Sequence, residues 1–126
     1  MSWQAYVDQN LLGTGKIAQA AIHGHDGNVW ATSAGFSVNA TEFQALFKAF
    51  KDPSGIRTSG LHINGKKYIA LRADERSIYA KAGNDGCACV KTNQSVLIGT
   101  YVEPTQPGEA TKIVESLADY LISVNY

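Results

Sequence analysis

The last part of the chain carries its most regular hydrophobic pattern. Apolar side chains from Ala110 to Ile122 recur at spacings of three and four residues, with charged residues on the opposite side, and this period is typical of an amphipathic helix. Pro107 and Gly108 stand where such a helix would begin. Tyr120 lies at the edge of the apolar stripe, so the pattern predicts a half-exposed ring.

A second helical pattern lies near the start of the chain. Trp3 and Tyr6 are three residues apart, and helical spacing continues to Leu11. Ser2 belongs to the residue types that cap helix N-termini. The glycine-rich stretch 13–15 is a stop signal, so the sequence predicts one α-helix here.

The third helical pattern is rich in phenylalanine. Apolar residues from Phe43 to Phe50 recur at i, i+3, i+4 and i+7, which predicts a firm amphipathic helix. Asn39 and Glu42 have the spacing of a capping box, although Thr41 is an alternative N-cap. The Asp-Pro-Ser-Gly stretch 52–55 predicts that the helix ends there.

Short apolar stretches separated by turn residues fill the rest of the chain. The residues 25–28 indicate a hairpin, and Asn64-Gly65 is the strongest short signal for a type I′ turn. Sequential strands joined by tight turns form an antiparallel meander. The expected strands span residues 17–22, 29–33, 61–63, 66–73, 77–81, 87–91 and 95–101.

The order of these elements predicts an α+β fold. The chain has 126 residues without a repeat or linker, so we expect a single domain over residues 1–126. A central antiparallel sheet of about six or seven strands must be covered on both faces. We expect the N- and C-terminal helices to pack together on one face and the phenylalanine-rich helix to cover the other.

Composition excludes several classes of protein. The 11 basic and 11 acidic residues balance, so no bulk charge favours nucleic acid. No apolar stretch is long enough to span a membrane, and no signal peptide is recognisable. Cys87 and Cys89, the only cysteines, would stand roughly 6–7 Å apart on a strand. We interpret them as reduced thiols on a half-buried strand, which fits a cytoplasmic protein.

Catalytic and metal-binding patterns are missing from the sequence. There is no phosphate-binding loop, no nucleophile elbow, and no zinc-type spacing among His23, His25, His62 and the two cysteines. A cysteine–histidine nucleophile stays open as an alternative. The sequence predicts a binding module that is not an enzyme and uses no cofactor or metal.

Aromatic residues gather at both ends of the chain. Trp3 and Tyr6 are helical neighbours, and Tyr120 and Tyr126 belong to the last segment. If the terminal helices pack side by side, these rings form one patch, which Trp30 could join from the second strand. Such patches read polyproline II ligands, because the rings stack on prolines and their N–H and O–H groups bond the ligand's carbonyls. The alternative is that the rings belong to the core.

Basic residues are concentrated in the central hairpins, where only Asp74, Glu75 and Asp85 oppose them. Such a cluster is either a solvated face without a binding role or a docking surface for an acidic partner or for anionic lipid. These basic residues are Lys66, Lys67, Arg72, Arg76, Lys81 and Lys91.

Several stretches together resemble the profilins, and fungal profilins in particular. They are residues 2–8, 13–16, 29–31, 72–79 and 108–121, so the resemblance covers the whole chain. It implies a monomer that binds monomeric actin, promotes exchange of actin's nucleotide and thereby regulates polymerisation at the cytoskeleton. It also implies binding to proline-rich segments of formins and to phosphatidylinositol bisphosphate at the membrane surface.

The resemblance also implies two separate binding sites on the chain. The proline site would comprise Trp3, Tyr6, Trp30, Tyr120, Leu121 and Tyr126, with Leu121 as part of the wall. The actin site would comprise Lys67, Arg72, Arg76, Tyr79, Lys81, Gly108, Thr111, Lys112 and Glu115. Lys112 and Glu115 fall on the polar side of the last helix, which predicts that they are free to contact a partner.

Three departures from the family pattern bear on lipid binding and strand packing. Ala80 stands where glycine is usual, and the stretches 23–26 and 82–86 carry less positive charge than expected. Two alternatives to the actin-binding interpretation therefore stay open. One is a peripheral phosphoinositide-binding module, and the other is a proline-peptide adaptor without actin activity.

Overall fold

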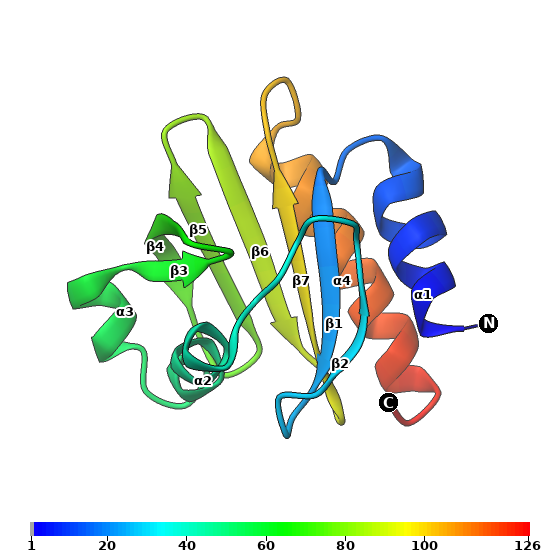
Figure 1. Cartoon of the computed structure of the whole chain (residues 1–126), viewed down its shortest axis with the longest axis horizontal. Coiled ribbons are helices and arrows are strands. Elements are labelled where there is room, and N and C mark those ends of the chain that lie inside the picture. The colour runs from blue at the N-terminus through cyan, green and yellow to red at the C-terminus, as the bar shows by residue number, and fades with distance from the viewer. Residues whose placement is uncertain (1) are drawn as a thin grey trace.

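The computed structural model describes residues 2–126 and contains one seven-stranded antiparallel sheet, in the order β2-β1-β7-β6-β5-β4-β3 (Figure 1). The strands are β1 Gln19–Gly24, β2 Val29–Thr32, β3 Leu61–Ile63, β4 Lys66–Ala73, β5 Ser77–Ala82, β6 Asp85–Lys91 and β7 Ser95–Tyr101. The helices are α1 Trp3–Ala5, η1 Tyr6–Leu11, η2 Leu12–Thr14, α2 Ala40–Ala49, α3 Ser54–Ser59 and α4 Pro107–Ser123.

Each face of the sheet carries its own hydrophobic core. The N-terminal helical segment and α4 lie side by side on one face (Figure 1), where Val7, Leu11 and Val114 are fully buried against the strands. On the other face, Phe43 and Leu46 of α2 pack over the sheet. The expected α+β fold and the placement of the helices on the two faces are confirmed.

The N-terminal segment differs from the single α-helix that its spacing predicts. The Ser2 hydroxyl accepts the Ala5 N–H at 3.1 Å, as expected of an N-cap. From Tyr6 the backbone widens to a π-helix, tightens to a 3-10 turn, and ends at Gly15 in the left-handed region (φ 74°). Such widened turns occur often at functional sites, and this one carries the two buried side chains Val7 and Leu11.

The start of α2 is fixed by a reciprocal pair of hydrogen bonds. The Asn39 side chain accepts the Glu42 N–H at 2.8 Å, and the Glu42 carboxylate accepts the Asn39 N–H at 3.2 Å. Asn39 is therefore the N-cap, and Thr41 is not. The same buried carboxylate accepts the N–H groups of Asn64 and Gly65 at 2.9 and 2.7 Å. Their positive φ angles (53° and 78°) agree with the predicted turn.

Helix α3 was missing from the sequence prediction. The stretch 52–55 ends α2 as expected, but it also starts a second helix, because the Asp52 carboxylate accepts the Ser54 N–H and hydroxyl at 3.2 and 2.8 Å. Only Ile56 of this short helix is buried, so no helical period marks it. Strand β1 also begins and ends two residues later than predicted.

Strand β6 is covered on both faces, which corrects the prediction of a half-buried strand. Cys87 and Cys89 are 1% and 0% exposed, and neither forms a disulfide. The neighbouring Cys87 thiol and burial together raise the pKa of Cys89. Because both side chains are shielded from solvent, both sulfurs are inert core atoms. No helix within residues 2–126 is long and apolar enough to cross a membrane.

His23 makes stability depend on pH. Its ring is 1% exposed and stacks on Phe43 at 5.0 Å, with Nδ1 on the Gly27 carbonyl at 3.2 Å and Nε2 without a partner. Burial lowers the pKa of His23 from its ordinary 6.5. The unfolded chain therefore takes up a proton first, so stability is full above pH 6.5 and falls as the pH drops toward the lowered value.

We expect urea titrations at pH 7.5, 6.5 and 5.5 to show this loss in the native chain. The free energy of unfolding of His62→Gln should fall by the same amount between pH 7.5 and 5.5, because His62 is exposed. His23→Leu should have a flatter profile, and an unchanged profile in that variant would contradict the assignment.

Candidate functional site

Five aromatic side chains from three distant segments form one cluster, here called the aromatic patch: Trp3, Tyr6, Trp30, Tyr120 and Tyr126. Trp3 is its centre, with ring centroids 4.6 Å from Trp30, 5.0 Å from Tyr126 and 5.5 Å from Tyr6. Tyr6 and Tyr120 connect the two terminal helices, and their ring centroids are 6.2 Å apart. The structure therefore brings together the five rings that the sequence placed at its two ends and on the second strand.

Hydrogen bonds to the backbone hold both ends of the chain in the patch. The Tyr126 carbonyl oxygen accepts the Thr92 hydroxyl at 2.7 Å and the Gln94 N–H at 2.5 Å, which ties it to the β6–β7 turn. Near the other end, the Gln4 amide donates to the Thr32 carbonyl at 3.0 Å. The rings are thus presented by anchored segments.

The patch is open to a ligand. Tyr120 and Tyr126 are 50% and 42% exposed, and the other three rings are half-buried. Burial, and then the neighbouring Tyr120 hydroxyl, raise the pKa of Tyr6, so its phenol stays a hydrogen-bond donor. Leu121 is fully buried in the core beneath, which corrects its expected place in the wall: it supports the patch from within.

A second surface lies on β4 and β5. Ile69 and Leu71 are 64% and 60% exposed, among the largest apolar exposures in the described chain. Lys81 pairs with Ile69 across the strands, so cations flank the apolar side chains. A shallow cavity of about 200 Å³ touches Leu71, Lys81 and Pro107, which places the start of α4 beside this surface.

The sequence prediction missed Ile69 and Leu71. A signal existed, because residues 68–71 are all apolar and so present hydrophobic groups on both sides of a strand. One side, with Tyr68, is buried in the core. The other side lies outside the cover of the helices, so Ile69 and Leu71 form an exposed apolar pair on this face of β4.

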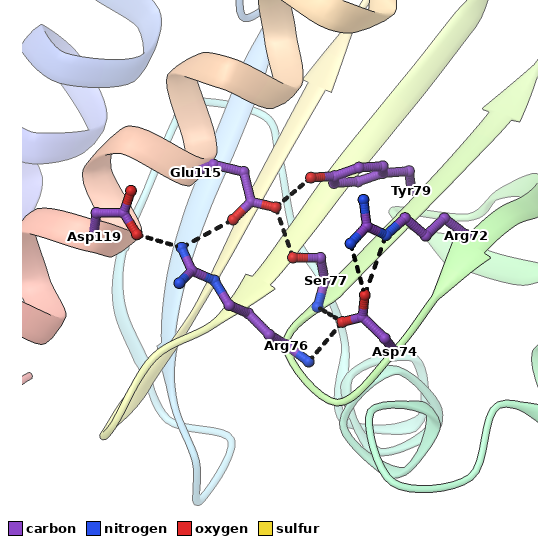
Figure 2. A network of polar contacts seen from close by, with 7 residues as sticks. All are labelled: Arg72, Asp74, Arg76, Ser77, Tyr79, Glu115 and Asp119. Atoms are coloured by element: carbon purple, nitrogen blue, oxygen red, sulfur yellow. Dashed lines mark hydrogen bonds and ion pairs between the residues drawn. The ribbon is translucent and has the colours of Figure 1, made fainter.

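Figure 2 shows a polar network that joins β5 to α4. The Glu115 carboxylate accepts Arg76 Nη2 at 3.0 Å, the Ser77 hydroxyl at 2.6 Å and the Tyr79 hydroxyl. Arg76 also donates to Asp119 at 2.6 Å. Glu115 is therefore engaged inside the molecule, which corrects the expectation that it is free, whereas Lys112 is exposed as predicted.

The same network holds the Arg72 side chain in place. Its guanidinium donates to Asp74 at 3.0 Å and lies 5.4 Å from the Tyr79 ring centroid. Asp74 in turn accepts the N–H groups of Arg76 and Ser77 at 2.9 and 2.7 Å (Figure 2). Burial, followed by Glu115, raises the pKa of Tyr79, so its hydroxyl remains a donor.

The residues of the expected actin site fall into two groups. Those on the open surface are Lys67, Arg72, Lys81, Gly108 and Lys112, with Thr111 half-buried. The others, Arg76, Tyr79 and Glu115, belong to the network beneath. Ion pairs engage Lys66, Arg72 and Arg76, so the basic hairpins do not form a uniform cationic face. Within residues 2–126, no group of His, Cys, Asp and Glu is arranged to hold a metal ion.

Comparisons with known proteins agree with this arrangement. The family model described as profilin matches residues 1–126. Profilin-2 of Acanthamoeba castellanii is 55% identical over 126 residues, and profilin of Saccharomyces cerevisiae is 52% identical over 127, with both chains covered completely in each case.

Solved structures give the same result. Acanthamoeba castellanii profilin IA has a TM-score of 0.97 at 54% identity, covering 99% of this chain and 100% of that one. Mouse profilin IIa, solved in complex with a double repeat from the FH1 domain of mDia1, has a TM-score of 0.84 at 27% identity with both chains fully covered. The match over the full length, in sequence and in fold, shows that this chain belongs to the profilin family.

Proposed function

We propose that this protein binds monomeric actin through the β4–β5 surface and the start of α4, and binds proline-rich segments of formins through the aromatic patch. In this way it promotes exchange of actin's nucleotide and delivers actin to nucleators in the cytoplasm. The observation that carries the proposal is the presence of two separate open surfaces, one of clustered rings and one of exposed apolar side chains flanked by cations.

Profilins are actin-binding proteins that regulate actin polymerisation, and family membership extends this general role to the chain. The mouse relative bound to a formin repeat supports the proline-binding part of the proposal. On the actin side, Ile69 and Leu71 would supply packed contacts, and Lys67 and Lys81 would steer association and fix the register.

Nucleotide exchange would be promoted without a catalytic group. A ligand shifts a conformational equilibrium only through different affinities for the two states. The protein would therefore bind an open form of actin more tightly than the closed form. By reciprocity, it should also bind nucleotide-free actin more tightly than nucleotide-bound actin.

Release of a fluorescent nucleotide from monomeric actin tests this function directly. We expect the release rate to rise with the concentration of this protein and then to saturate. Lys48→Glu should preserve the effect, because Lys48 is an exposed residue of α2, which lies on the other face of the sheet. Unchanged release together with no association by analytical ultracentrifugation would refute the actin-binding part and leave a proline-peptide adaptor.

A lipid-binding module is the less favoured alternative. Three of the six basic residues in the hairpins are engaged in ion pairs, which reduces the charge available to phosphatidylinositol bisphosphate. Binding through the remaining lysines would collapse between low and moderate salt, because exposed charges are screened beyond about 8–10 Å. Ring stacking on prolines would hardly change with salt.

A further inference from the structure

A groove runs between the N-terminal helical segment and α4, next to the aromatic patch. Its volume is about 590 Å³, within the range of roughly 300–1,000 Å³ that is typical of ligand sites. Tyr6 and Tyr120 belong to both features, because they line the groove and are also members of the patch. Their ring centroids are 6.2 Å apart. A ligand chain lying across these two rings would therefore continue directly into the groove.

The lining of the groove has an apolar floor and a polar rim. The buried Leu117 and the half-buried Ile113 and Tyr6 form the floor. The exposed residues Asn10, Ser116 and Tyr120 stand at the rim. The floor suits one branched apolar side chain, and the rim offers hydrogen-bonding groups to an extended backbone.

Lys112 gives the groove its charge preference. It is the only charged residue in the lining, and it is exposed. None of the ion pairs among residues 2–126 involves it. Lys112 also belongs to the expected actin site, so in the absence of actin its ammonium group is available to a carboxylate on the ligand.

We propose that this groove is a second subsite for the proline-rich ligand, and that it takes a flank in which a branched apolar residue is followed by a carboxylate. The inference rests on the proposed proline-binding function, since it concerns the same ligand beyond its prolines. The patch then provides general affinity for prolines, and the groove selects among proline-rich segments by their flanks.

Peptide titrations that follow tryptophan fluorescence would test the subsite. The probes are ten prolines alone, ten prolines followed by Ser-Leu-Glu, and the same flank placed before the prolines. The flank is tested at both ends because stacking on Tyr6 and Tyr120 does not determine which end of the peptide enters the groove. We expect one flanked peptide to bind about tenfold more tightly than the plain peptide, from burial of the leucine side chain and the added ion pair.

Two variants locate the source of that gain. Ser116→Phe fills the groove and should remove the gain, while affinity for the plain peptide stays within about twofold. Lys112→Glu should also remove it, and a Ser-Leu-Lys flank should restore it in that variant. Lys51→Glu, an exposed lysine beyond the end of α2 on the other face of the sheet, should keep the full gain.

The outcomes separate this inference from the function on which it rests. Equal affinities of plain and flanked peptides for the native chain would overturn the subsite and leave the proline function standing. A gain that persists in Ser116→Phe and Lys112→Glu would also overturn it, because the flank would then bind elsewhere. If ten prolines alone do not bind, the proline function fails and the subsite fails with it.

Discussion

Trp3→Ala should weaken binding of a ten-proline peptide by at least about thirtyfold, or roughly 2 kcal/mol. Trp3 is the ring that contacts Trp30, Tyr6 and Tyr126, at centroid distances between 4.6 and 5.5 Å. Its removal deletes the largest stacking surface and also leaves its neighbours without lateral support. The loss should therefore exceed that from any single ring at the margin of the patch.

Calorimetric titration of the native chain and the variant would measure this change. Tyr120→Ala, at the 50% exposed margin, should lose less. Acceleration of nucleotide release from actin should be unchanged in Trp3→Ala, because the patch is separate from the β4–β5 surface. Loss of both activities in a variant that still unfolds cooperatively would refute the two-site arrangement.

Leu71→Asp should raise the protein concentration needed for half-maximal nucleotide release from actin by more than about thirtyfold. Leu71 is 60% exposed in the free chain, so the substitution costs little folding stability. In a complex it would replace the burial of a leucine, worth about 1.5–3 kcal/mol, by the burial of an unpaired carboxylate.

Val29→Asp is the matched control for that substitution. Val29 is also an exposed apolar residue on a strand, at 54%, but β2 lies at the opposite edge of the sheet from β3 and β4. It should leave nucleotide release unchanged. Equal effects of the two substitutions, or no effect of Leu71→Asp, would show that actin does not contact this part of β4.

The sequence predicted those elements whose hydrophobic period is long. The stripe of α4 and the phenylalanines of α2 are each recorded by several side chains, so the positions of these helices followed from spacing alone. The strands were located by the turn residues between them, because β6 and β7 are buried without alternation. Helix α3 was missed because one buried residue, Ile56, has no period. The π-helical turns of the N-terminal segment were missed because i+4 and i+5 hydrogen bonding leave nearly the same pattern of buried residues.

The candidate sites were predicted unequally for a related reason. Aromatic rings at chain ends are rare enough to be noticed, so the patch was found residue by residue. For Glu115, helical spacing predicted its side of α4 but not its partners. These are Ser77 and Tyr79 of β5, which lie 38 and 36 residues earlier in the chain. Leu71 escaped notice because exposure depends on how far the helices extend across the sheet, and no local pattern records that.

The carboxylate of Glu42 links the hydrogen exchange of two distant segments. It accepts the backbone N–H of the N-cap residue Asn39 and those of Asn64 and Gly65, and the last two residues are exposed. Turn amides at a surface normally exchange their hydrogens with water within the fluctuations of the turn itself. Here their exchange also requires the Glu42 carboxylate to release them, so we expect opening of the β3–β4 turn to be coupled to loss of the α2 N-cap.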